Sequence, residues 1–222
     1  MLVRIDYAIN IDYVIYLEGN FLSFRALFLH FREMKHYFIA ATFVFATGLI
    51  LGYGYSEQFD RILNSQLQSL DNIAKAIGET KQPQLWLFIF IFFNNVIKSI
   101  FTVYTGLFFG IFPLFFLLIN GMVLGYIGEL QQGQWLYLAK GILPHGIIEI
   151  PAIIIASAYG IRLGTLVIKG IVSVTSLERQ EAFKREALRF LKLTIPLCAF
   201  LALSLFAAAV IESTLTMWLL GK

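Results

Sequence analysis

Two side chains that can bind a metal ion or transfer a proton lie four residues apart in an otherwise apolar stretch. His145 and Glu149 occur within LPHGIIEIPA, residues 143–152. Residues four apart share one face of an α-helix, so the imidazole and the carboxylate should point in the same direction. Ionisable groups at membrane depth are costly and usually face a bundle interior or a water-filled cavity. The pair therefore marks a candidate functional site.

Polar side chains on two neighbouring apolar segments are predicted at a similar depth. At 1.5 Å per helical residue, Glu149 lies about 9 Å, Asn120 about 10 Å and the pair Asn94 and Asn95 about 15 Å from the same membrane surface. Lys98 follows Asn94 by one helical turn. The sequence thus predicts a polar intramembrane cluster of Asn94, Asn95, Lys98 and Asn120 beside the histidine and the glutamate.

Three interpretations of this cluster remain open. The amides and Glu149 can form hydrogen bonds between helices that fix their packing. His145 and Glu149 can bind a divalent metal such as zinc, which needs at least one more ligand or a water; Asn120 or a residue of a symmetry-related copy would serve. The cluster can instead line a transport or catalytic cavity, with Glu149 as proton carrier or base. No H-E-x-x-H or G-x-S-x-G motif is present, so we expect no enzymatic activity and no obligatory cofactor.

The elements that must position these residues are predicted to be membrane-spanning helices. The chain has 222 residues, of which 59% are hydrophobic and 14% charged, and its mean hydropathy is +0.77. Soluble domains are about half apolar and a quarter charged. Only helices satisfy their own backbone hydrogen bonds in lipid, so the fold class is all-α, a polytopic transmembrane bundle with interfacial helices. We predict five spans at residues 37–54, 84–103, 106–127, 143–164 and 191–220.

Two boundaries follow from length and from proline. Residues 84–127 would measure about 66 Å as one helix, about twice the thickness of the hydrocarbon core. We therefore expect a tight turn at TVYTG, residues 102–106. Proline is favoured in a first helical turn, so the fourth span is expected to begin near Pro144.

Outside the spans, the sequence predicts an N-terminal amphipathic segment, residues 1–36, and a membrane domain, residues 37–222. Residues 55–83 have the apolar spacing of an external helix, and residues 177–193 should lead directly into the fifth span. Lys and Arg concentrate in residues 1–36 and 162–192, which places these segments and the N-terminus in the cytoplasm and the C-terminus outside. We attribute the basic residues to topology and lipid head-group contacts rather than to nucleic acid.

Small residues at four-residue spacing predict close helix contacts. Such residues allow two helix backbones to approach each other in a membrane. Span one has Gly48 and Gly52, and long apolar faces are also compatible with pairing of two copies. The other candidates for helix packing are Gly106, Gly110, Gly121, Gly125, Ala152, Ala156 and Gly160.

The motifs together resemble one known family. They are the N-N pair at 94–95, the G-x-x-x-G-x-x-P run that starts at Gly106, the N-G pair at 120–121 and L-P-H-G-x-x-E-x-P-A at 143–152. They resemble the stage II sporulation protein M family of bacterial and archaeal integral membrane proteins. The similarity extends over roughly residues 35 to 218.

The resemblance implies a five-helix membrane protein. The family's namesake acts in engulfment of the forespore, as a scaffold that recruits two peptidoglycan-degrading partners, and members also occur outside spore formers. We therefore expect a non-enzymatic membrane scaffold that binds the lipid bilayer and partner proteins such as peptidoglycan hydrolases. The alternative is a zinc-binding transporter or intramembrane hydrolase centred on His145 and Glu149.

Overall fold

The structure is a computed structural model that describes residues 24–219, apart from the side chains of Trp135, Tyr137 and Met217. Of the described residues 91% are helical and none is in a strand, which confirms the all-α prediction. Most of the predicted N-terminal segment, residues 1–23, and the last residues of the chain lie outside this description. The helices in chain order are α2 (Phe24–Glu33), α3 (Lys35–Gly54), α4 (Ser56–Gly78), α5 (Pro83–Thr105), α6 (Ile111–Leu130), α7 (Trp135–Ser173), α8 (Leu177–Ile211), the π-helical turn η1 (Glu212–Thr216) and α9 (Met217–Leu219).

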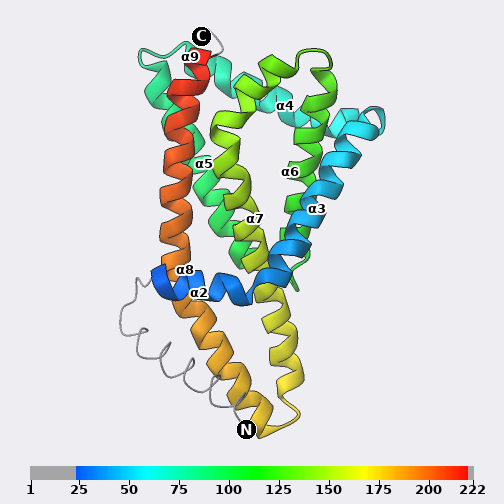
Figure 1. Cartoon of the computed structure of the whole chain (residues 1–222), viewed down its shortest axis with the longest axis vertical. Helices are drawn as coiled ribbons and strands as arrows, with labels where there is room; N and C mark the ends of the chain where they lie inside the picture. Colours follow the sequence, from blue (N-terminus) through cyan, green and yellow to red (C-terminus); the bar gives the residue numbers. More distant parts are fainter. Residues whose placement is uncertain (1–23, 220–222) are drawn as a thin grey trace.

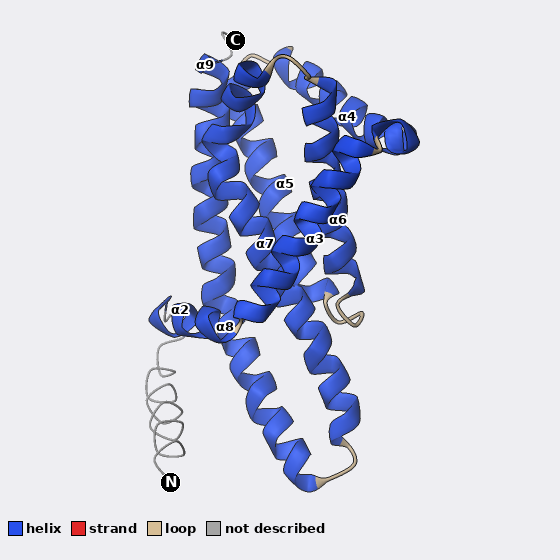
Figure 2. Cartoon of the chain, turned by 45° about the vertical axis from the view of Figure 1, so that its right-hand side comes forward, coloured by secondary structure: helices blue, strands red, loops and turns tan. Residues whose placement is uncertain are grey.

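Five of the described helices are long and apolar enough to cross a membrane, namely α3, α5, α6, α7 and α8 with η1. Figure 1 shows these five as a bundle, with α4 lying across one end and α2 across the other. The lower parts of α7 and α8 continue beyond α2 as a helical hairpin, which is also clear in the turned view of Figure 2. The hairpin and the C-terminal α9 thus lie at opposite ends of the molecule.

The outer surface of the bundle is apolar. Large side chains such as Phe43, Phe101 and Phe115 are 72%, 67% and 59% exposed. A water-soluble domain would bury rings of this size. Their exposure on helices of spanning length is what a lipid-facing surface requires.

The turn between α5 and α6 lies later than the sequence predicted. Residues 102–105 remain helical, and the turn occupies residues 106–110. Two features explain the shift: Thr102 and Val103 are buried in the bundle, and Gly110 has a positive φ of 77°, which glycine adopts without steric cost. The expected turn at 102–106 was wrong, and α6 begins at Ile111.

The fourth span also begins earlier than predicted. Helix α7 starts at Trp135 and runs through both Pro144 and Pro151. In Figure 1 its first turns run across the end of the bundle before the helix turns down through it. Prolines within a helix remove a backbone hydrogen bond and permit such bends. The expected helix start at Pro144 was therefore wrong. Helix α8, by contrast, runs unbroken from Leu177 into the fifth span, as predicted.

Glycine pairs hold α3 against α6. A Cβ atom built on Gly48 or Gly52 would overlap the α6 backbone at Leu118 or Met122. The contact is reciprocal, since a Cβ on Gly121 or Gly125 would overlap the α3 backbone at Phe45 or Leu49. The two helix backbones therefore touch over two turns.

A second glycine contact holds the α5–α6 turn against α7. Gly106 lies against Gly160, and Gly110 against Gly164. Ala152 and Ala156 of α7 lie one to two turns before Gly160 and are fully buried. They belong to the same core cluster as Val103 of α5 and Leu197, Leu201 and Leu205 of α8.

Candidate functional site

A cavity of about 380 Å³ lies inside the bundle at the end covered by α4. We call it the polar cavity, because six amide, imidazole and carboxylate side chains line it among apolar residues. Helices α3, α4, α5, α6 and α7 and the turn η1 all contribute to its wall. The polar lining residues are Asn94, Asn95, Asn120, His145, Glu149 and Glu212.

Helix α4 forms the cover of this cavity. Leu70, Ile73 and Ile77 line it from the α4 side. The helix is fixed to α6 by a hydrogen bond from the Tyr126 hydroxyl to the Asp60 carboxylate. The predicted external helix at 55–83 is thus part of the wall of the candidate site.

The amides of α5 contact the carboxylate of α7. Asn95 Nδ2 donates a hydrogen bond of 2.9 Å to Glu149 Oε1, and Asn94 Nδ2 donates one of 3.2 Å to Asn95 Oδ1. The structure therefore brings these three predicted residues together. The bond fixes one oxygen of the carboxylate and leaves the other for a further partner.

The other two members of the predicted cluster, Asn120 and Lys98, make no contact of this kind with Glu149. Asn120 lines the cavity, but its Nδ2 donates to the backbone oxygen of Phe116 on its own helix, at 2.7 Å. Lys98 has an exposed side chain and is not among the residues that line the cavity. The structure thus gathers Asn94, Asn95 and Asn120 around the cavity and leaves Lys98 outside it.

Glu212 was not among the site residues predicted from the sequence. This residue begins the π-helical turn η1 at the end of α8, and its Oε2 lies 4.0 Å from His145 Nε2. On the other ring nitrogen, Thr216 Oγ1 is 3.5 Å from His145 Nδ1. One-turn π segments occur frequently at functional sites. The sequence signal that could have indicated Glu212 is an acidic residue directly after the apolar run AAAVI, residues 207–211.

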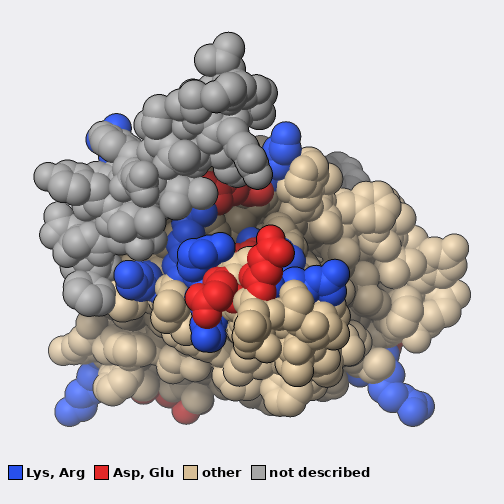
Figure 3. Space-filling view, turned by 90° about the horizontal axis from the view of Figure 1, so that it is seen from below, with Lys and Arg blue, Asp and Glu red and all other residues tan. Residues whose placement is uncertain are grey.

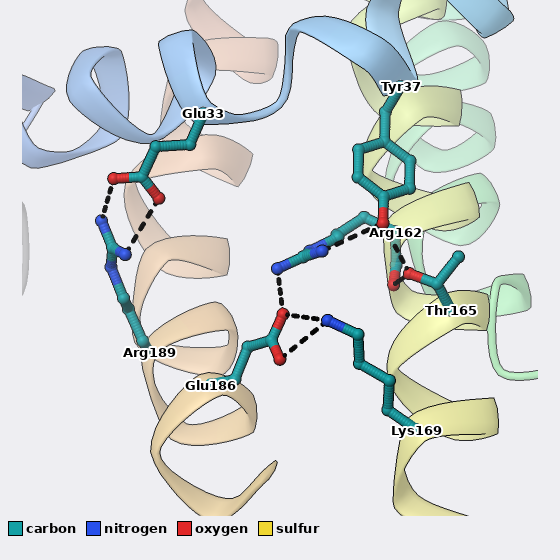
Figure 4. A network of polar contacts seen from close by, with 7 residues as sticks. All are labelled: Glu33, Tyr37, Arg162, Thr165, Lys169, Glu186 and Arg189. Carbon is teal, nitrogen blue, oxygen red and sulfur yellow. Dashed lines mark hydrogen bonds and ion pairs between the residues drawn. The ribbon is translucent and has the colours of Figure 1, made fainter. Parts of the chain in front are cut away.

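A second polar network joins α2, α3, α7 and α8 where the hairpin leaves the bundle (Figure 4). The Arg162 guanidinium donates to the Tyr37 hydroxyl at 2.9 Å and forms an ion pair with the Glu186 carboxylate. Lys169 Nζ lies 3.0 Å from the same carboxylate. Arg162 and Lys169 were predicted to set the topology and to contact lipid head groups, whereas in the structure both pair with Glu186.

The amphipathic helix α2 is attached to the same region. Its Glu33 accepts two hydrogen bonds from Arg189 of α8, at 2.9 and 3.0 Å. Its His30 is buried, and His30 Nδ1 lies 2.8 Å from the Tyr159 hydroxyl oxygen of α7. Burial, with Arg189 and Arg162 nearby, lowers the pKa of His30 from 6.5 to about 3.

This lowered pKa predicts that α2 detaches more readily in acid. A detached α2 would expose His30, whose pKa would then be about 6.5. The docked form has the lower pKa, so docking is at full strength above pH 6.5 and weakens as the pH falls below it. The loss is about 2 kcal/mol at pH 5. Hydrogen exchange of the α2 amides, corrected for intrinsic rates, should show lower protection at pH 5 than at pH 7.

Two variants separate His30 from general acid effects. His30→Asn, which cannot be protonated, should abolish the pH dependence of α2 protection. His36→Asn removes an exposed histidine six residues away and should leave the pH dependence of α2 protection unchanged. Equal protection of wild-type α2 at both pH values would contradict the prediction.

Two comparisons with known proteins found sequence matches. The sequence model of the family described as "Stage II sporulation protein M" matches residues 41–217. The chain is also 25% identical over 190 residues to the uncharacterized protein MJ0706 of Methanocaldococcus jannaschii, an alignment that covers 82% of each chain. No solved structure matches the chain significantly.

Proposed function

Because the chain belongs to the stage II sporulation protein M family, we propose that this multi-pass membrane protein is a scaffold that recruits or organises partner proteins. The observation that supports this proposal is the α7–α8 hairpin, residues 163–188, most of which extends beyond the bundle (Figure 2). Helix α5 has 23 residues and is about 35 Å long, whereas α7 has 39 residues and is about 58 Å long. Part of the excess length forms the first turns of α7 across the α4 end of the bundle, and the rest forms its arm of the hairpin.

The hairpin has the properties of a docking element. Its base is fixed by the ion pairs of Glu186 with Arg162 and Lys169. Near its tip the apolar side chains Val174 and Leu177 are 72% and 80% exposed. Figure 3 shows basic and acidic side chains gathered on this end of the molecule. Exposed apolar residues surrounded by charge are typical of protein-binding surfaces.

Charge gives the proposed orientation. The basic residues of α2 and of 162–192 lie at the same end of the bundle, and the positive-inside rule assigns that end to the cytoplasm. On this proposal the C-terminus and α4 face outward. A partner that degrades peptidoglycan, as in engulfment, would then contact the α4 end, where Ile62 is 59% exposed. A second copy of the chain is a further proposed partner.

Site-specific cross-linking tests the scaffold proposal. A photo-cross-linking amino acid at position 177 or at position 62 should capture a defined membrane or cell-wall protein from the native host. A lipid-facing position such as Phe101 serves as the matched control, because its side chain is similarly exposed and lies in the span. Adducts to lipid alone at both test positions would contradict the scaffold role. Capture at only one position identifies the side on which the partner binds.

The second candidate function is that of a metal-binding transporter or intramembrane hydrolase. It is favoured by the polar cavity, in which His145, Glu149 and Glu212 face one another. Polar cavities inside membrane bundles are where substrate and ion sites occur. A transport or hydrolysis assay in proteoliposomes, with Glu149→Gln as the inactive control, tests this candidate. Absence of both activities would remove it.

A further inference from the structure

Three metal-ligating side chains converge on one point of the polar cavity. His145 and Glu149 lie one turn apart on α7, and Glu212 reaches them from η1 of α8. One ligand atom of each residue lies within 4.8 Å of the others. Ligand atoms around a tetrahedral zinc ion lie about 3.3 Å apart. Side-chain rotations that move each ligand atom by about 1 Å would therefore bring the three atoms around one ion.

We propose that His145, Glu149 and Glu212 bind one divalent transition-metal ion, with Zn²⁺ as the best match, and leave a coordination position open toward the cavity. One imidazole and two carboxylates form a borderline donor set that suits Zn²⁺. Zinc sites with three protein ligands keep the fourth position for water or substrate. This inference deepens the second candidate function and assigns its metal ligands.

Electrostatics favours a cation at this point. Two half-buried carboxylates face the polar cavity. The Lys98 ammonium is near enough to interact electrostatically with Glu149, but among the described residues neither carboxylate forms an ion pair with Lys or Arg, and Glu212 pairs with His145. Charges withdrawn from water without a direct ion-pair partner are costly, and metal coordination is one way to remove that cost. A dipositive ion would balance both carboxylates while the imidazole stays neutral.

The surrounding hydrogen bonds have the pattern of an outer coordination shell. Metal-bound histidine usually donates its second ring N–H to a neighbouring acceptor, which fixes the ring. Thr216 Oγ1 is 3.5 Å from His145 Nδ1, on the side of the ring away from the Nε2 that faces Glu212. Asn95 donates to one oxygen of Glu149 in the same way. These contacts assign Nε2 and the free carboxylate oxygens as ligands.

The open position would face a cavity of about 380 Å³, covered by α4. The amides of Asn94 and Asn120 line the same space and can hydrogen-bond a water or a polar group on the ion. The volume exceeds what a single water needs. The site therefore has room for an exchangeable ligand.

Zinc titration of the full chain tests the proposal. Chelator-treated protein in nanodiscs should bind one Zn²⁺ per chain by calorimetry and elemental analysis. Glu212→Gln and Glu149→Gln should each weaken binding at least about tenfold, the smallest effect expected even for outer-shell residues. Glu129→Gln, at the same end of the bundle but outside the cavity lining, should bind as the wild type does. Folded wild type without stoichiometric zinc, or unchanged binding in Glu212→Gln, would overturn the assignment.

X-ray absorption at the zinc edge provides a test that needs no variant. The expected spectrum has one imidazole and oxygen neighbours, without sulfur. A sulfur neighbour would assign the ion to Cys198, the one cysteine of the sequence, and would remove the proposed site. Zinc binding with the predicted spectrum, but without transport or hydrolysis in proteoliposomes, would leave the metal site standing and remove only the second candidate function.

Discussion

Replacing Gly52 with alanine is expected to destabilise the helix bundle by about 2–3 kcal/mol or more, the upper range for overpacked cores. The added Cβ would overlap the backbone of Met122 on α6, and a backbone cannot rotate away as a side chain can. Helices α3 and α6 would have to separate, which also disturbs the neighbouring contact of Gly48 with Leu118. Thermal or denaturant unfolding in detergent, followed by circular dichroism, measures the loss.

Gly54→Ala is the matched control. Gly54 lies two residues further along the same helix, and a Cβ at this position has no atom within 4 Å. Alanine is the better helix former, so this variant should be neutral or more stable by up to about 1 kcal/mol. Equal behaviour of the two variants would show that the α3–α6 backbone contact does not limit stability.

Replacing Glu186 with glutamine is expected to have the second largest effect. The neutral amide leaves the Arg162 guanidinium and the Lys169 ammonium without their shared counter-charge at the base of the hairpin. Removing one partner of a fully buried ion pair costs about 3–5 kcal/mol. The Glu186 side chain is 29% exposed, so we expect about 1–3 kcal/mol. The variant should have a lower unfolding temperature and faster hydrogen exchange in residues 163–188.

Glu181→Gln separates this effect from a general change in charge. Glu181 lies on the same helix, five residues earlier. Its side chain is 61% exposed, and within residues 24–219 it pairs only with Lys184. Exposed pairs of this kind contribute about 0–1 kcal/mol. The hairpin should therefore exchange as in the wild type. If both variants loosened the hairpin equally, Glu186 would not be the residue that fixes its base.

Much of the fold follows from the pattern of apolar residues. Segments of about 20 apolar residues have to be helical in lipid, because no other spanning structure satisfies the backbone within one segment. The five spans are of this kind. The external helix at 55–83 and the helix at 177–193 follow instead from apolar side chains spaced three or four residues apart. Helix ends were less predictable: residues 102–105 stay helical because Thr102 and Val103 are buried by other helices.

The candidate site was predictable only in part. His145, Glu149 and the amides of Asn94 and Asn95 are recognisable because polar side chains are rare in apolar spans. Glu212 has the same signal but lies 63 residues from Glu149, so sequence alone could not pair it with His145. Likewise, the sequence did not show that Glu186 is the ion-pair partner of Arg162 and Lys169, because these residues are also distant along the chain.

The sequence by itself determined that this chain is helical, crosses a membrane and has polar groups within its spans, since these properties depend on composition and local spacing. Tertiary structure alone decided which polar groups meet. The π-turn at Glu212–Thr216 sets the direction of Glu212, and the glycine contacts set how closely the helices approach. Both depend on packing between distant segments, where a shift of one residue in helix register redirects a side chain by about 100°.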